Sequence, residues 1–263
     1  MTENIKIMLK SIKAEILRDI RETFSYKTGI ISDIAVLSIL FLSIIYLGSG
    51  TQIQKYYKGL NGSRTLLLTG YIFWTYSVSA INTMSKEINY EAMKGTLAKK
   101  YTAVTPFYAL LAGVVLSSLT INSIVAIFII AISKIVVGIN IIINIKVFSS
   151  LIITLVGMYG VGLLYGGIAL RVKRIGQLVF VTQIILLFIS DTLTKTKLSE
   201  GIGKIIPLTA GIDIARKSIG GLNVGINDWS ILIGSSIFWL FIGMYFFHKS
   251  QQYAKKYGLI NVY

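Results

Sequence analysis

Long apolar stretches alternate with shorter polar segments along most of the chain. Each stretch approaches the roughly 20 apolar residues that an α-helix needs to cross a ~30 Å hydrocarbon layer. The six stretches cover residues 30–47, 65–84, 107–133, 147–170, 177–190 and 229–247. The fifth is the shortest, and it needs its flanking residues, or burial within protein, to complete a crossing. The pattern therefore predicts an all-α integral membrane protein with six transmembrane helices in a single domain, residues 29–263.

The first 28 residues have a different pattern. Apolar residues spaced three or four apart form a stripe, and Lys6, Lys10, Lys13, Arg18 and Arg21 lie on the other faces. This stripe consists of Ile5, Met8, Leu9, Ile12, Ile16, Ile20 and Phe24. An amphipathic helix lying in the membrane interface, apolar side down, has this pattern, and so does a helix packed on a soluble partner. We expect residues 1–28 to form the interfacial helix on the cytoplasmic side.

The polar segment between the second and third spans, residues 85–106, does not resemble a plain connector. Its first half predicts a polar helix, in which Glu87 and Glu91 lie one turn apart and Lys94 is within pairing reach of Glu91. Gly95 is expected to end or bend this helix.

The segment between the fifth and sixth spans, residues 191–228, is longer than ordinary connections. Pro207 precedes a second helical stripe within it, formed by Leu208, Ile212, Ala215, Ile219 and Leu222. A short helix that dips partway into the membrane, or that caps the outer ends of the spans, explains this stripe. A helix that merely shields the bundle explains it equally well.

Composition supports a membrane protein. Charged residues make up only 14% of the 263 positions, whereas soluble domains carry about 25%. The net charge of +15 is spread over the loops and is not gathered on one face, so we expect attraction to anionic lipid and no nucleic-acid partner. Lysine and arginine favour the loops on the side of the N-terminus, which predicts that both termini are cytoplasmic.

The chain lacks the residues that most catalytic and metal sites need. It has no cysteine, and its only histidine is His248, which excludes thiolate chemistry and histidine-cluster metal sites. No phosphate-binding loop is present. We therefore predict no catalytic residue, no metal site and no cofactor in this chain.

Ionisable residues inside the membrane would mark an ion path, because each is costly there. Only Asp33 and Asp191 come close, and both lie at span ends, where we expect water to reach them. This weakens the case for a proton-driven transporter without excluding it. In the fourth span, Gly162 and Gly166 form a G-x-x-x-G pair that lets helices approach closely. Packing within the chain and packing between subunits both fit this pair.

The segment from Glu91 to Leu97, followed by Pro106, resembles the E-x-x-x-G-T-L…P signature of ABC-2 type permeases, the exporter class of ABC transporters. Further similarities follow in the same order along nearly the whole chain. They are Gly70…Trp74, Leu111-Ala112-Gly113, Pro207…Arg216 and Lys255…Leu259. The likeness is greatest to daunorubicin-resistance-type drug exporters.

The resemblance implies an export permease of a prokaryotic plasma membrane. Two such chains would form the translocation path, and two separate ATPase subunits, which bind ATP and magnesium, would dock beneath them. The helix around Glu87 and Glu91 would be the coupling helix, with both carboxylates facing basic residues in a groove of the ATPase. Gly95 and Thr96 would fix the turn that transmits displacement, while Leu97 completes the motif.

The sequence leaves several alternatives open. An ion-gradient-driven secondary transporter would work without any ATPase. A non-transporting membrane protein, such as an immunity factor or scaffold, would act even if a partner ATPase were inactive. The substrate could be a drug, an antibiotic, a peptide or a lipid-like molecule, and the second permease chain could be identical or different.

Overall fold

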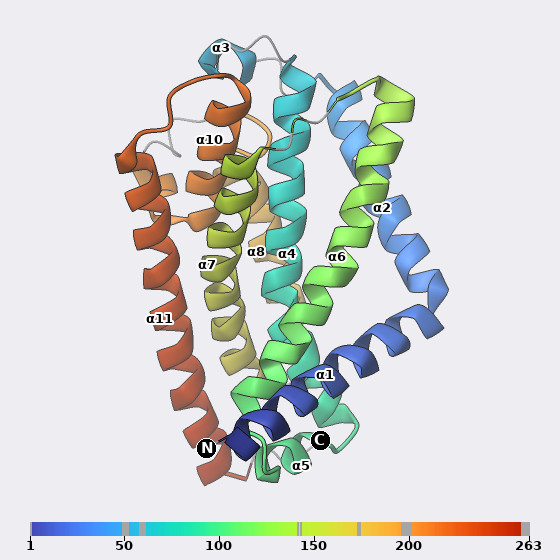
Figure 1. Ribbon diagram of the computed structural model, residues 1–263, viewed down its shortest axis with the longest axis vertical. Coiled ribbons are helices and arrows are strands. Elements are labelled where there is room, and N and C mark those ends of the chain that lie inside the picture. The colour runs from blue at the N-terminus through green and yellow to red at the C-terminus, as the bar shows by residue number, and fades with distance from the viewer. Residues whose placement is uncertain are drawn as a thin grey trace.

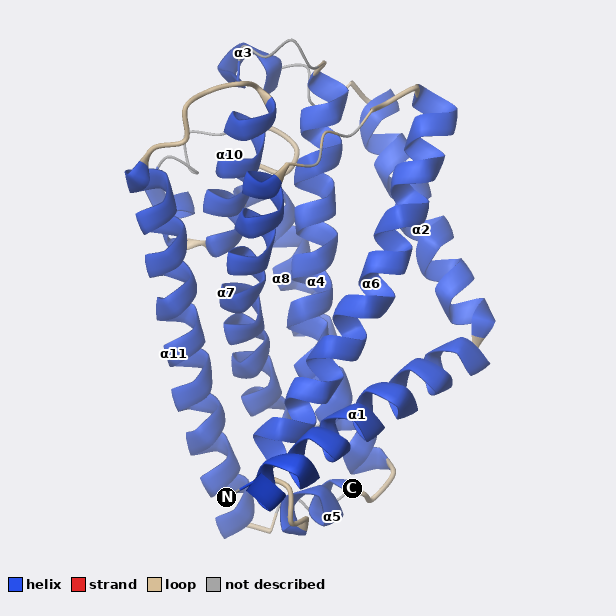
Figure 2. Ribbon diagram, in the orientation of Figure 1, coloured by secondary structure: helices blue, strands red, loops and turns tan. Residues whose placement is uncertain are grey.

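The computed structural model describes residues 2–48, 53–57, 62–140, 142, 144–172, 175–195 and 201–258, and these ranges contain helices and no strand (Figure 2). The helices are α1 (Thr2–Ser25), α2 (Lys27–Tyr46), α3 (Ile53–Tyr57), α4 (Ser63–Met93), α5 (Leu97–Thr102), α6 (Phe107–Val137), α7 (Ile145–Ala169), α8 (Gly176–Ile189), the 3₁₀-helix η1 (Ile202–Ile205), α10 (Pro207–Ile219) and α11 (Ile226–Lys256). The all-α class is confirmed. Leu259 of the C-terminal motif, and residues 196–200 of the outer segment, lie outside the described residues.

Four of the described helices, α2, α6, α7 and α11, are long and apolar enough to cross a membrane. The apolar helix α8 is shorter, at 14 residues, and α4 is long but more polar. The six-span count therefore stays a prediction. Two helices run beyond the expected spans. The polar helix expected after the second span is the continuation of α4, and α11 continues past His248 to Lys256.

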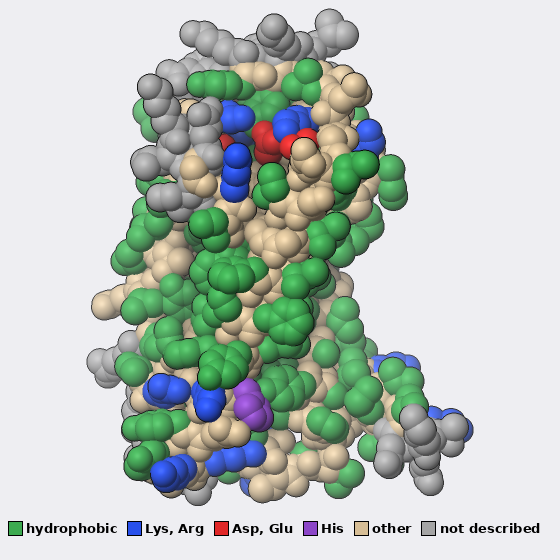
Figure 3. All heavy atoms as spheres, turned by 90° about the vertical axis from the view of Figure 1, so that its left-hand side faces the viewer, with side chains coloured by type: hydrophobic (Ala, Val, Ile, Leu, Met, Phe, Trp, Pro, Cys, Tyr) green, Lys and Arg blue, Asp and Glu red, His purple; other side chains and the backbone are tan. Residues whose placement is uncertain are grey.

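The long helices lie side by side along the longest axis of the molecule (Figure 1). α3 and α10 lie at one end, whereas α5 and the start of α1 lie at the other, together with the end of α11. On the face beside α11, apolar side chains cover the middle and charged side chains gather toward both ends (Figure 3). An apolar band between charged ends is the distribution that a bilayer favours.

α4 lies at the centre of the bundle and is buried on all sides in its first turns. Every residue from Thr65 to Tyr71 is buried. A helix surrounded by protein does not need an apolar surface toward lipid, because its polar groups find partners in neighbouring helices or in the helix itself. The Tyr71 hydroxyl, for example, donates to the Leu37 carbonyl of α2 at 2.7 Å, whereas those of Thr69 and Ser77 donate to carbonyls one turn back in α4. This burial explains why α4 is more polar than its neighbours.

The glycines of α7 bring its backbone close to two other helices. A Cβ atom on Gly162 would lie 2.5 Å from the carbonyl oxygen of Ala80 in α4, and one on Gly243 would overlap the backbone of Gly160. Gly166 faces Met84 and other side chains of α4 and α11. The G-x-x-x-G pair, whose partner the sequence left open, therefore packs within the chain.

α10 begins about halfway along its neighbours. Pro207, its first residue, lies against Gly157 at the middle of α7, where a Cβ atom would come within 2.6 Å of the proline Cγ. Just before it, the Ile205 carbonyl accepts a hydrogen bond from the indole of Trp239 in α11 at 2.9 Å. From this depth α10 rises toward the α3 end, where Gly220 contacts the Tyr57 carbonyl. Its buried residues face α4, α7 and α11.

Candidate functional site

The turn between α4 and α5 closes the lower end of α4. Gly95 has φ +68°, a left-handed conformation that glycine adopts without steric cost. Its N–H donates to the Ala92 carbonyl at 3.0 Å, and the Thr96 N–H donates to the Glu91 carbonyl at 2.9 Å. This pair of bonds is a Schellman motif, which satisfies carbonyls at a helix end. The predicted end at Gly95 agrees with this geometry, and Pro106 directly precedes α6.

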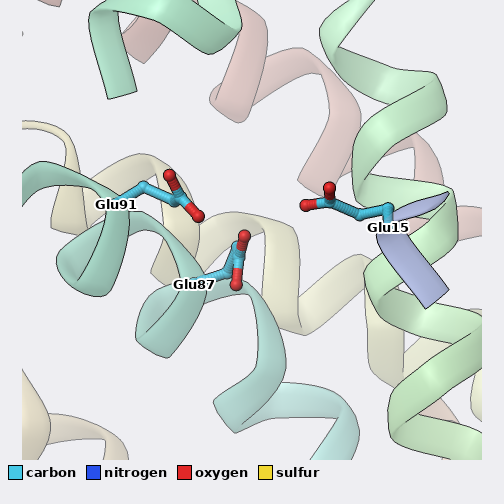
Figure 4. Close-up of side chains that lie close together, drawn as sticks. All are labelled: Glu15, Glu87 and Glu91. Carbon is cyan, nitrogen blue, oxygen red and sulfur yellow. The ribbon is translucent and has the colours of Figure 1, made fainter. Parts of the chain in front are cut away.

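Three carboxylates meet behind this turn, and we call Glu15, Glu87 and Glu91 the carboxylate cluster. Glu15 comes from α1, and it faces the other two, which lie one turn apart on α4 (Figure 4). The Lys100 ammonium from α5 lies among them, 2.5 Å from Glu15, 2.8 Å from Glu87 and 3.1 Å from Glu91. One lysine thus joins α1, α4 and α5.

Two further side chains complete the cluster. The Arg18 guanidinium lies 3.0 Å from Glu15, 3.1 Å from Glu87 and 2.8 Å from Glu91. The Thr96 hydroxyl donates to the second carboxylate oxygen of Glu91. Three anions are therefore balanced by two cations and a hydroxyl, which is how buried charges are normally tolerated.

The spacing of the three carboxylates alone would suit a metal ion, since one oxygen from each lies within 4.8 Å of the others. The Lys100 ammonium contacts all three of these side chains. A cation such as Mg²⁺ would have to displace the Lys100 ammonium. It would then still face the Arg18 guanidinium, which contacts the same three carboxylates. The arrangement is therefore that of an ion-pair cluster joining three helices.

The cluster shifts the pKa values of its members. Burial raises the pKa of the Glu87 carboxyl, which Lys100 only partly offsets. Burial acts in the same direction on Glu91, but the hydrogen bond from Thr96 and the charge of Lys100 outweigh it and hold the pKa of Glu91 below its usual value. Burial by itself lowers the pKa of Lys100, yet the carboxylates of Glu87 and Glu15 raise it overall. Lys100 therefore stays a cation and Glu91 an anion near neutral pH.

The burial of the cluster corrects one expectation about the coupling helix. Glu87 and Glu91 are only 8% and 2% exposed, so neither carboxylate faces a groove in a partner. The expected pairing of Lys94 with Glu91 is also wrong, because Lys94 lies 3.3 Å from Glu22 of α1. Both glutamates instead act inside the chain, where they hold α1 against α4.

A different set of residues is exposed at this end. Met93 is 78% exposed and Val104 is 90% exposed, and the exposed residues Lys94, Gly95 and Lys99 accompany them. We call these five residues the coupling surface. Met93, Lys94 and Gly95 lie at the turn that ends α4, Lys99 lies on α5, and Val104 lies in the segment between α5 and α6. Exposed apolar side chains among lysines suit contact with another protein.

α1 turns its polar side toward the protein. The Ser11 hydroxyl contacts that of Thr105 at 2.8 Å, and Ser117 of α6 donates to the carboxylate of Asp19. Gly113 of α6 permits this close crossing, because a Cβ atom there would lie 2.9 Å from that of Glu15. The stripe residues Ile5, Leu9 and Phe24 are exposed. This arrangement favours the interfacial interpretation of the helix over packing of its apolar side on a soluble partner.

Sequence reasoning missed Glu15, Arg18 and Lys100. The first two lie on the polar side of an amphipathic helix, and periodicity does not say which side of such a helix meets protein. Lys100 belongs to a Lys-Lys pair in which only one member, Lys99, is exposed. The acidic and basic residues of the cluster lie on helices that are distant in sequence. Nothing in the sequence pattern shows that these residues are in contact.

The predicted outer motif forms a second buried site, around Arg216 of α10. This side chain is 0% exposed. Its guanidinium donates to the carbonyls of Leu66 in α4 at 3.0 Å, Asp191 at 2.6 Å and Thr192 at 2.8 Å. Asp191 is itself only 4% exposed, so the expectation that water reaches it is wrong. Arg216 therefore joins α10, α4 and the end of α8.

Two sequence motifs meet at this site. Gly70 makes room for the arginine, since a Cβ atom there would lie 2.3 Å from Nη2 of Arg216. One turn further along α4, the Trp74 indole donates to the Gln183 carbonyl of α8 at 3.1 Å. The glycine and tryptophan of the G-x-x-x-W motif thus hold α10 and α8 against α4.

A family model described as ABC-2 type transporter matches residues 8–219. The match begins in α1 and ends with α10, so it includes the carboxylate cluster, the coupling surface and Arg216. No curated protein matches the chain.

Proposed function

Because this chain belongs to the ABC-2 type transporter family, and is therefore a multi-pass membrane permease of an ABC transporter, we propose that it is the transmembrane subunit of an ATP-driven exporter. Two permease chains form the path, and ATP and Mg²⁺ bind to separate ATPase subunits. The substrate is a drug, antibiotic, peptide or lipid-like molecule, as the resemblance to drug exporters suggests.

The coupling surface carries this proposal. Met93 at the turn offers apolar contact area to a groove of the ATPase, and Val104 offers a second contact beside the start of α1. Lys94 and Lys99 favour an acidic rim. Directly behind it, the carboxylate cluster ties the turn to α1, α4 and α5. A surface that is braced in this way moves together with three helices and does not bend locally.

α4 provides the route for that displacement. It is one uninterrupted helix of 31 residues, about 46 Å long at 1.5 Å per residue. Its lower end carries the carboxylate cluster, and its upper turns accept the Arg216 hydrogen bond at Leu66. A push on the coupling surface would therefore reach α10 and the end of α8 through a rigid element.

We further propose that the coupling surface faces the cytoplasm of a prokaryotic cell, which places both termini there. α1 then lies in the inner interface, with Ile5, Leu9 and Phe24 toward lipid. On the outer side, α10 is a re-entrant helix, since its first residue lies beside the middle of α7.

The test uses the Gly95→Pro variant. Proline fixes φ near −65° and cannot adopt the +68° found at this turn. We expect the variant to insert and fold but to lose its ATPase partner. The tagged chain would be purified from its native cell in mild detergent, and co-purifying ATPase activity measured.

Gly138→Pro is the matched control. Gly138 follows the end of α6, at the end of the molecule away from Gly95, and has a similar φ of +72°. Its Cβ position is also open. We expect this variant to retain the ATPase. Equal ATPase activity with Gly95→Pro and the unchanged chain would contradict the proposed docking. If no ATPase accompanies even the unchanged chain, a gradient-driven transporter or a non-transporting membrane protein becomes the better assignment.

A further inference from the structure

A cleft of about 780 Å³ lies between the α1–α2 elbow, α4 and α6. The lower part of α2 stands away from α4, and α1 slants below it (Figure 1). Tyr26 and Asp33, which line the cleft near the elbow, are exposed, so its mouth opens beside α2. Small-molecule sites commonly have volumes of about 300–1,000 Å³, and this cleft falls in that range.

Acidic residues dominate the charged lining of the cleft. Its carboxylates are those of Asp19, Glu22, Asp33 and Glu87, against the single cation Lys86. Glu87 is neutralised within the carboxylate cluster, and Glu22 is paired with Lys94. Asp19 and Asp33 form no ion pair with any residue in the part of the chain that the structure describes.

Asp19 and Asp33 are unusual in a chain with a net charge of +15, where cations are abundant. Among the described residues, Asp19 accepts a hydrogen bond from the Ser117 hydroxyl and from no other side chain. Two carboxylates that share a partly apolar cleft without a cation favour the approach of a cation from outside the chain.

The rest of the lining is amphipathic. Val36, Val78, Val114, Ile121 and Val125 contribute apolar surface from α2, α4 and α6. Asn82, Asn89 and Asn122 add neutral polar side chains to the lining.

We propose that this cleft binds an amphiphilic organic cation, which enters from the membrane beside the α1–α2 elbow. Its charged nitrogen lies near Asp19 and Asp33, and its apolar body packs on the valines of α4 and α6. This inference rests on the proposed export function, because it names the chemical class of the substrate.

The test compares two probes of the same shape and opposite charge, tetraphenylphosphonium and tetraphenylborate. Each is bound separately to the full-length chain in neutral detergent, by equilibrium binding of the labelled probe. We expect the cation to bind about tenfold more tightly than the anion, since two partly exposed carboxylates contribute up to about fivefold each.

The variant Asp19→Asn/Asp33→Asn removes both charges and keeps an acceptor for Ser117. It should reduce the preference for the cation to about twofold or less. Asp228→Asn, which removes a carboxylate at the opposite end of the molecule, should leave the preference unchanged. Equal binding of both probes, no binding of either, or an equal effect of Asp228→Asn would each overturn the proposal. The assay needs no ATPase, so these outcomes are independent of the co-purification test.

Discussion

Gly70 and Arg216 show how the role of a residue depends on what lies opposite it. Many glycines of this chain have open space at the Cβ position, including Gly234 in the middle of α11. At Gly70 the same space holds the guanidinium of Arg216, which donates to three carbonyls. Charged donors strengthen such bonds, and a buried arginine that loses them is left with an uncompensated charge.

We therefore expect Gly70→Ala to destabilise the protein by about 1–3 kcal/mol, because the added methyl group overpacks the arginine site. The melting temperature of the purified chain in detergent should fall accordingly. Gly234→Ala, in an equally helical setting, should leave it nearly unchanged. Equal melting temperatures for the two variants would show that Arg216 adjusts without loss.

At the scale of elements, the most buried contacts of α1 are made by its charged and polar residues, and no residue of its apolar stripe is fully buried. Ser11, Glu15, Arg18 and Asp19 face the protein. Of the stripe, Ile5, Leu9 and Phe24 are exposed and the other four residues are half-buried. In water this orientation would be unfavourable, because it leaves apolar side chains exposed to solvent. In a membrane interface it is the favourable one, because lipid accepts the apolar side and protein satisfies the charges.

Lys100→Met should release α1 from this position. It leaves three buried carboxylates with Arg18 as the remaining cation, and breaking a buried ion pair costs about 3–5 kcal/mol. We expect a lower melting temperature and faster proteolysis within residues 2–25. Lys99→Met, which changes the exposed neighbour, is the control. It should leave the melting temperature and the rate of proteolysis within residues 2–25 unchanged. A stable α1 in Lys100→Met would show that the cluster does not hold it.

At the scale of the whole molecule, the helices of the bundle alternate in direction once the shorter α8 is included. α4 runs from the α3 end to the α5 end, α6 returns, and α7 runs again toward the α5 end (Figure 1). α8 then leads back toward the upper turns of α4, and α11 runs toward the α5 end. The proposed orientation therefore assigns every loop to one side of the membrane, and each assignment can be tested separately.

Single cysteines test this orientation directly, because the sequence contains none. Lys99→Cys and Lys256→Cys should react only with a membrane-permeant thiol reagent in intact cells. Arg64→Cys and Asn227→Cys, at the opposite end, should also react with an impermeant one. The reverse labelling pattern would invert the orientation, and mixed labelling within one end would contradict the six-span arrangement.

The sequence by itself determined the features that depend on local pattern. Apolar length predicted helices at each expected span, periodicity predicted α1 and α10, and glycine at position 95 predicted the end of α4. The resemblance in the segments around Glu91 and Pro207 agrees with the family match. These signals are local because hydrophobic burial and backbone conformation act on neighbouring residues.

The tertiary structure decided which side of each element meets protein. Only the fold shows that Glu87 and Glu91 point inward to Lys100, that Met93 and Val104 are exposed in their place, and that α10 begins halfway along α7. Pairing of charges across distant segments depends on which helices are neighbours, and hydrophobic period does not encode that choice. The acidic cleft has the same origin, because four helices contribute its lining and no one of them carries the pattern alone.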